Sequence, residues 1–168
     1  PARDPRPTIR GIAAGGLSNC ETWSETDPDL YMEELAEARR RLAAAGVPLF
    51  VSVGYLAEDV ASLIRRAEKE VDPAGYEFST HYTGGSVEPL VDVAKAARRA
   101  ADKPLWMKLS PAFPALEELV RRAEPYVDAF AAVNSYGPVL DIDPENPGPR
   151  LGSPEGYGWM SGPPLLPM

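Results

Sequence analysis

The sequence has almost none of the side chains that form disulfides or bind transition metals. Its 168 residues include one cysteine, Cys20, and one histidine, His81. A single cysteine excludes an internal disulfide framework and a zinc site with several cysteine ligands. A single histidine likewise excludes a zinc centre with several histidine ligands. We therefore expect no metal site.

Long apolar runs and strongly basic stretches are also missing. No segment has the roughly 20 consecutive apolar residues of a transmembrane helix, and the formal net charge is −8 with an isoelectric point near 4.7. This charge argues against nucleic acid or an anionic membrane as a partner. The composition, 44% hydrophobic and 25% charged, is typical of a soluble globular protein, and we expect a cytoplasmic location. From the first residue, Pro1, and the apolar last four residues we expect a piece of a longer polypeptide.

What the sequence does contain is a regular alternation of two patterns. Short apolar segments predict strands at residues 8–14, 49–53, 76–79, 104–109 and 127–133. Between them, apolar residues at helical spacing predict helices at residues 28–45, 60–71, 87–101 and 116–123. Such alternation with short connections predicts right-handed βαβ units and a parallel sheet. The sheet is either open and doubly wound or part of a barrel, and the lack of a Gly-rich phosphate-binding fingerprint after any strand favours the barrel.

Polar side chains follow the ends of these strands, as they do on the catalytic face of a β/α barrel. Lys108 lies in an otherwise apolar strand, where it either reaches water or stabilises negative charge on an electron-rich cofactor atom. Asn134 and Ser135 follow the last strand. They either hold a planar heterocycle through their donors and acceptors or only begin a turn.

The segment 79–83 holds the best candidates for a general base. It contains His81, whose ordinary pKa suits proton transfer near neutral pH, and Tyr82, which could act as an acid or base with help from His81. The competing interpretation is a loop histidine with a structural or solvated role.

In the order of its motifs the chain resembles the FMN-dependent dihydroorotate dehydrogenases and the flavin domain of dihydropyrimidine dehydrogenase. Gly16-Leu17-Ser18-Asn19 is similar to the Gly-Leu-Pro-Asn loop of that family, residues 76–79 to its Glu-Leu-Asn strand, and residues 107–111 to its Val-Lys-Leu-x-Pro strand. Residues 133–135 resemble its Asn-Ser/Thr motif, and residues 156–162 its Gly-Phe-Gly-Gly-x-x-Gly passage. The resemblance implies an α/β fold of the (β/α)8 TIM-barrel type, of which this chain supplies roughly strands two to six. Residues 1–168 would be one partial barrel domain, and residues 134–168 a long loop after its fifth strand.

The resemblance also implies roles for individual residues. FMN would be the cofactor, contacted by Lys108, Asn134, Ser161 and Gly162. The substrate would be contacted by Gly16, Leu17, Asn19, Ser79, Asn134 and Ser135. The implied enzyme is a dehydrogenase of the CH–CH class in pyrimidine metabolism, which transfers hydride from a small cyclic, dihydropyrimidine-like substrate to the flavin. Its catalytic residues would be Lys108 with His81 or Tyr82.

The chain departs from the family pattern at several positions. The family's substrate asparagine, six places before Asn19, is Ala13 here, and its fourth-strand asparagine is Ser79. These departures leave the substrate open and support an alternative, a non-catalytic or regulatory barrel homologue that lacks the base, with or without the flavin. The expected partners are a small-molecule substrate and either the rest of the barrel or a second copy of the chain.

Overall fold

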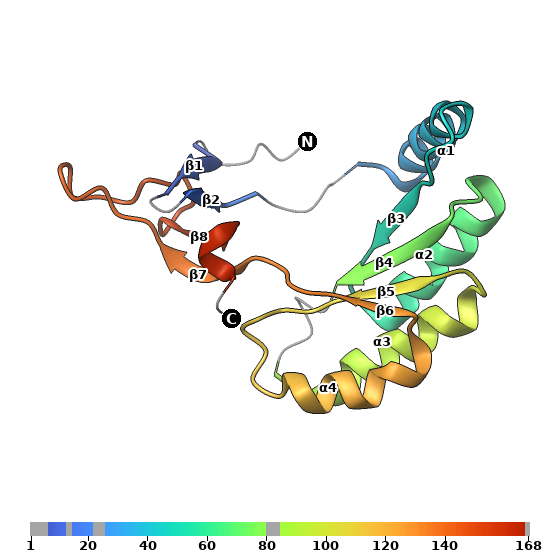
Figure 1. The fold of residues 1–168 in the computed structure, drawn as a ribbon. Helices are drawn as coiled ribbons and strands as arrows, with labels where there is room; N and C mark the ends of the chain where they lie inside the picture. Colours follow the sequence, from blue (N-terminus) through green and yellow to red (C-terminus); the bar gives the residue numbers. More distant parts are fainter. Residues whose placement is uncertain (1–6, 13–14, 22–25, 80–84, 167–168) are drawn as a thin grey trace. The chain divides into compact units, whose positions relative to one another are not determined.

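The computed structural model describes residues 7–12, 15–21, 26–79 and 85–166, and it divides into two compact units (Figure 1). The larger unit is Asp27–Val133, and the smaller consists of Pro1–Thr26 and Asn134–Met168. Each unit has its own four-stranded sheet, so each is held together by its own ladder of backbone hydrogen bonds.

The larger unit is an α/β structure with a parallel sheet. Its strands are β3 (Phe50–Val53), β4 (Gly75–Ser79), β5 (Leu105–Lys108) and β6 (Ala129–Ala131), in that order across the sheet. Its helices are α1 (Pro28–Ala44), α2 (Ala57–Glu70), α3 (Val87–Ala100) and α4 (Leu116–Ala123), followed by the 3-10 turn η2 (Glu124–Tyr126). The four predicted helices and the last four predicted strands are confirmed.

Local chemistry explains where the first helix begins and ends. The Asp27 carboxylate accepts a hydrogen bond from the backbone N–H of Asp29 at 2.8 Å, and Pro28 occupies the first helical position. Gly46 follows the helix with a φ of 69°. That left-handed backbone conformation favours glycine, because a Cβ there would clash with the backbone.

The face of the parallel sheet that packs on the helices forms the core. Five of its side chains are at most 1% exposed: Val51, Tyr76, Phe78, Leu105 and Met107. They belong to one apolar cluster with residues of α2, α3 and α4, which lie along the same side of the sheet (Figure 1). Because side chains alternate along a strand, the intervening residues project from the opposite face.

One core side chain carries a polar atom without a matching partner. The Tyr76 hydroxyl and Glu68 Oε1 are both buried, and neither has a hydrogen-bond partner of acceptable geometry among the described residues. Burial, and then the nearby Glu68 carboxylate, raise the pKa of Tyr76. The neutral phenol is therefore favoured in the folded state, and its contribution to stability is present below pH 10 and lost as the pH rises above that value.

We expect Tyr76→Phe to keep the stability at pH 7 or raise it by up to about 1 kcal/mol, because it removes a buried hydroxyl that is not hydrogen-bonded. It should also reduce the loss of stability above pH 10. Urea unfolding at pH 7 and pH 10.5 measures both effects, with Tyr31→Phe on α1 as the control. A clear loss of stability at pH 7 would mean that the hydroxyl is hydrogen-bonded after all.

The smaller unit is an antiparallel sheet. Its strands are β1 (Ile9–Gly11), β2 (Leu17–Asn19), β7 (Tyr136–Leu140) and β8 (Tyr157–Ser161), in the order β1-β2-β8-β7, and the 3-10 turn η3 (Pro163–Leu165) follows β8. Two predictions were wrong here. Residues 8–14 are not a strand of the parallel sheet, since 9–11 pair antiparallel with β2. Residues 134–168 are not one long loop, since they supply β7, β8 and η3.

The prolines and glycines that predicted a loop have particular places in this sheet. Pro138 lies where the pairing of β7 with β8 is irregular, between Tyr136 and Val139, and a proline is tolerated at such a position because no ladder hydrogen bond is lost. Gly158 lies against β2: a Cβ built on it would be 2.3 Å from the carbonyl oxygen of Asn19. The glycine is therefore required by close packing of two strands. Whether the chain is one partial barrel domain stays a prediction.

Candidate functional site

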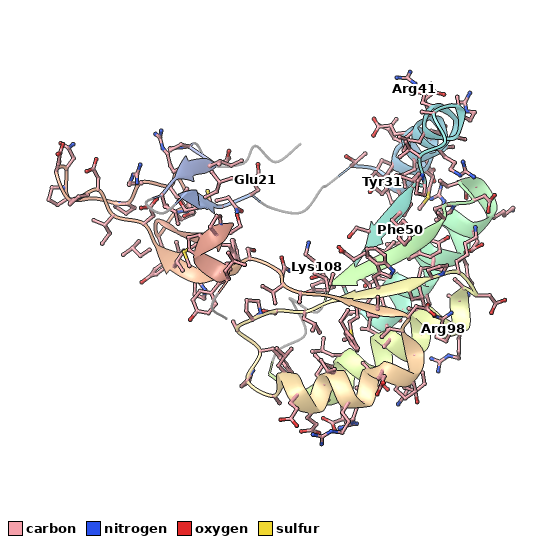
Figure 2. The ribbon with its side chains drawn as sticks, in the orientation of Figure 1. Glu21, Tyr31, Arg41, Phe50, Arg98 and Lys108 are labelled. Carbon is pink, nitrogen blue, oxygen red and sulfur yellow. The ribbon has the colours of Figure 1, made fainter. Side chains whose placement is uncertain are left out.

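The candidate site in the larger unit is at the carboxyl end of its sheet. Lys108 is the last residue of β5, and its register partners are Ser79 on β4 and Ala131 on β6 (Figure 2). Both neighbours have short side chains. Lys108 belongs to the face opposite the helix-covered core, and it lies at the carboxyl end of its strand, which is the end where ligands bind in β/α barrels.

A carboxylate from the neighbouring strand approaches this lysine. Lys108 Nζ lies 3.7 Å from Glu77 Oε1, and the two side chains are 35% and 24% exposed. The Ser52 hydroxyl on β3 lies 3.4 Å from the same oxygen and can donate to it. Half-buried charges are costly when unpaired, so the pair lowers the cost of placing a lysine at this end of the sheet.

The other end of the same face carries an aromatic pair. The rings of Phe50 and Trp106 have centroids 4.8 Å apart at a tilt of 40°. Gly75 pairs with Phe50 in the ladder, and a Cβ on it would lie 2.5 Å from Phe50 Cε1, so glycine makes room for the ring. The face thus runs from an aromatic, apolar end to the charged pair of Glu77 and Lys108.

The sequence did not single out Glu77, Ser52 or Trp106 as site residues. A signal was nevertheless present, because Glu77 is two positions before Ser79 in a short apolar strand and must share its face. What the sequence could not supply was the register, which places Glu77 opposite Ser52 on one side and Trp106 on the other.

A second group of predicted site residues gathers in the smaller unit. Leu17 pairs with Ser161, and Asn19 with Trp159, in the β2–β8 ladder. The side-chain nitrogen of Asn19 donates to the Trp159 carbonyl at 3.4 Å. Gly162 has a φ of 92°, and a Cβ on it would lie 3.3 Å from Cα of Gly16. The absence of a side chain at Gly162 therefore lets its backbone pack closely against the backbone of Gly16.

Asn134 and Ser135 also belong to the smaller unit. The Asn134 side-chain oxygen accepts a hydrogen bond from the backbone N–H of Ser135 at 2.9 Å. This local bond orients the amide just before β7, which begins at Tyr136. Two predicted site residues, His81 and Tyr82, lie outside the described residues. The structure thus brings Lys108 together with Ser79, and brings Gly16, Leu17, Asn19, Ser161 and Gly162 together in the other unit.

The smaller unit also contains three interacting polar side chains, one of them buried, beside an apolar hollow. Ser18, 1% exposed, donates from Oγ to Asp141 Oδ2 at 2.7 Å, and Arg150 Nη1 lies 3.5 Å from Asp141 Oδ1. The hollow is about 460 Å³ and is lined by these three side chains together with Ile12, Val139, Leu140, Ile142, Pro144, Met160 and Pro164. Hydrogen bonds donated by the Glu145 backbone and the Asn146 side chain lower the pKa of Asp143, and the positive charge of Arg150 adds to this effect. Arg150 also pairs with Asp141.

The described residues contain neither a metal-binding cluster nor a helix that could span a membrane. No group of three or more His, Cys, Asp or Glu side chains is placed to hold a metal ion in that part of the chain. Among the helices that the structure describes, not one has the length and apolar content needed to cross a bilayer.

Comparison with known proteins points to one enzyme family. A dihydroorotate dehydrogenase A (fumarate) of Solibacter usitatus is 34% identical over 145 residues, which cover 80% of this chain and 47% of that protein. The catalytic subunit of a dihydroorotate dehydrogenase B (NAD(+)) from Methanopyrus kandleri is 39% identical over 89 residues, covering 51% of this chain and 27% of that protein. Its counterpart from Methanocaldococcus jannaschii is 26% identical over 151 residues, covering 84% and 49%. The chain therefore spans about half the length, or less, of the curated relatives that it matches.

Two further comparisons add little to the sequence matches. No protein-family profile matches the chain. Among solved structures, a monomeric dihydrodipicolinate synthase variant, a TIM-barrel protein, is similar with a TM-score of 0.53 and 16% identity, over 67% of this chain and 39% of that one. At this identity the likeness concerns the fold alone, and it agrees with the parallel α/β arrangement of the larger unit.

Proposed function

Because the chain is related to the dihydroorotate dehydrogenases, as a divergent family member or a fragment of one, we propose that it forms part of a dihydroorotate dehydrogenase-like, FMN-dependent oxidoreductase. The proposed reaction is of the CH–CH class and transfers hydride from a small cyclic, dihydropyrimidine-like substrate. The proposed fold of the whole protein is a (β/α)8 barrel, to which this chain contributes the β3–β6 sheet. The proposed partners are the substrate and either the remaining barrel strands or a second copy of the chain.

The observation that carries this proposal is the position of Lys108. It lies at the carboxyl end of a parallel strand, on the face that the helices leave uncovered, with Ser79 and Ala131 beside it in the ladder. Small neighbours are compatible with a flat ring system over the end of the sheet. A cation there would stabilise the negative charge that develops on such a ring when it is reduced. A flavin, when bound, supplies the hydride acceptor for such a reaction.

The chain's own residues would hold and orient the reactants. The Lys108 ammonium would donate to an electron-rich atom of the cofactor ring and stabilise negative charge on it. Ser79, opposite Lys108 in the ladder, would contact the substrate through its hydroxyl. Asn134, Ser135, Ser161 and Gly162 are proposed contacts from the smaller unit, and His81 or Tyr82 is the proposed base.

The fit of the present residues to a flavin is uneven along the chain. At the end of β5 the ladder neighbours are small and Lys108 supplies a cation. At Gly16 the available space is filled by the protein, since a Cβ there would lie 2.8 Å from Pro164 Cγ and 2.9 Å from the Ser161 carbonyl oxygen. The backbone of Gly16, a substrate contact implied by the family resemblance, is therefore already packed against the protein itself, and Lys108 carries the proposal.

Titration of the purified chain with FMN tests the proposed cofactor. We expect quenching of flavin fluorescence and a shift of its visible absorbance, and a weaker effect with Lys108→Met, because the ammonium no longer contacts the ring. Riboflavin, which has the ring without the phosphate, is the control that separates contacts with the ring from contacts with the phosphate. Equal binding by the wild-type chain and the Lys108→Met variant would contradict the assignment of this lysine.

One observation favours the second candidate, a barrel homologue without catalysis. The position at which the related family has a strand asparagine is Ser79, which has one hydrogen-bonding group where an amide has two. A full-length protein that is colourless as purified and does not respond to added FMN would favour this alternative.

A further inference from the structure

We propose that Glu77 is a positioning residue that holds the ammonium of Lys108 at the carboxyl end of β5, and that Ser52 orients Glu77. The importance of this role for a reaction rests on the proposed function. The pair itself rests only on the geometry of the parallel sheet.

The register of the sheet places the three side chains on one face. Ser52 and Glu77 are directly paired between β3 and β4. Lys108 pairs with Ser79, two residues beyond Glu77, so Glu77 and Lys108 are diagonal neighbours. Such neighbours are within reach of each other when the side chains are long.

On the described strands β3 to β6, two residues of this face are charged. Of the residues of β3 to β6 that alternate away from the helices, Glu77 and Lys108 are the charged ones, and the rest are aromatic or small: Phe50, Ser52, Gly75, Ser79, Trp106, Ala129 and Ala131. With side chains 24% and 35% exposed, each charge is partly removed from water. At this partial burial the opposite charges attract each other more strongly than they would in bulk water.

The length of the contact indicates how Glu77 acts. At 3.7 Å the atoms are farther apart than in a charge-assisted hydrogen bond, which is typically about 2.7–2.9 Å. Glu77 therefore attracts the ammonium toward the sheet without occupying its donors in a short bond. Ser52, at 3.4 Å from the same carboxylate oxygen, limits the directions that the carboxylate can take.

The reactivity of the Lys108 amine toward acetic anhydride, followed by mass spectrometry of the cofactor-free chain, tests this role. Glu77→Gln keeps the size of the side chain and removes its charge. We expect Lys108 to be acetylated about two- to fivefold faster at pH 8 in this variant, because the carboxylate no longer draws the ammonium toward the sheet, and the effect is modest because half-exposed ion pairs contribute little. Glu77→Asp, which withdraws the carboxylate by one methylene group, should give an intermediate rate.

Lys95 is the internal reference in the same samples. Its side chain is 36% exposed and pairs with Asp92 at 3.1 Å on α3, so it matches Lys108 in exposure and kind of partner. General loosening of the fold would raise the labelling of both lysines, whereas loss of the Glu77 contact raises that of Lys108 alone. Unchanged labelling of Lys108 in both Glu77 variants would overturn the proposal.

Adding FMN to the wild-type chain separates this inference from the proposed function. Protection of Lys108 relative to Lys95 would support both the flavin and the lysine that contacts it. If FMN gives no protection while Glu77→Gln still raises labelling, the positioning pair stands and the flavin assignment fails. If FMN protects Lys108 and the Glu77 variants have no effect, the flavin assignment stands and the positioning role fails.

Discussion

Replacing Lys108 by Met should slow flavin reduction in the FMN-loaded protein by about 100-fold, the usual cost of removing one group that stabilises charge in a transition state. The variant keeps an apolar side chain of similar length, so its packing is preserved. It removes the cation that the proposed reaction needs at the end of β5. Stopped-flow absorbance of the flavin under anaerobic conditions measures the rate.

Stability should change little in the same variant. The Lys108–Glu77 pair is half-exposed, and such pairs contribute up to about 1 kcal/mol, which corresponds to a shift of roughly 2–4 °C in Tm for a chain of this size. Lys95→Met, on α3, removes a lysine of equal exposure that also pairs with a carboxylate. We expect it to leave flavin reduction unchanged. A parallel loss of folding and rate in Lys108→Met, or an equal effect of Lys95→Met, would remove the reason for a catalytic assignment.

Replacing Gly158 by Ala should destabilise the smaller unit by about 2–3 kcal/mol, because the new methyl group has no space. Its Cβ would lie 2.3 Å from the Asn19 carbonyl oxygen and 2.4 Å from Leu151 Cδ1. The leucine can move, but the carbonyl belongs to β2, so the two paired strands must separate. The effect should appear as faster hydrogen exchange of the amides in β2 and β8.

Gly11→Ala is the matched control in the same sheet. Gly11 lies in β1, and a Cβ built on it has no heavy atom within 4 Å, so we expect a change in stability of less than about 0.5 kcal/mol. Amides of β3 to β6 should exchange at the wild-type rate in Gly158→Ala, since that sheet has its own ladder. Equal tolerance of both substitutions would show that β2 and β8 are not packed as closely as described.

The larger unit could be predicted because its signals are local. Each helix carries its own apolar period and end signals, such as Asp27 with Pro28 before α1 and Gly46 after it. Each parallel strand follows a helical segment directly, so the alternation of the two patterns predicted a parallel sheet. The lysine at the end of β5 was identified for the same reason, since a charge in a short apolar strand is visible in the sequence.

The smaller unit could not be predicted because its pairing is distant in the chain. Strand β2 pairs with β8, about 140 residues later, with Leu17 opposite Ser161. Both strands are short, and Pro138 and Gly158 predict loops when each is considered alone. Only the folded chain places Pro138 at an irregular pairing and Gly158 against β2.

By itself the sequence determined a parallel α/β unit, a lysine at its carboxyl end and a relationship to one enzyme family. Those features depend on periodicity, capping and motifs, which neighbouring residues express. The tertiary structure decided which residues meet: the side chains of Glu77 with Lys108 and Ser52, the side chains of Ser18 with Asp141, and the backbones of Gly16 and Gly162. These contacts depend on register and on close approach of distant strands, and a shift of one residue in register would move each strand side chain to the other face of its sheet.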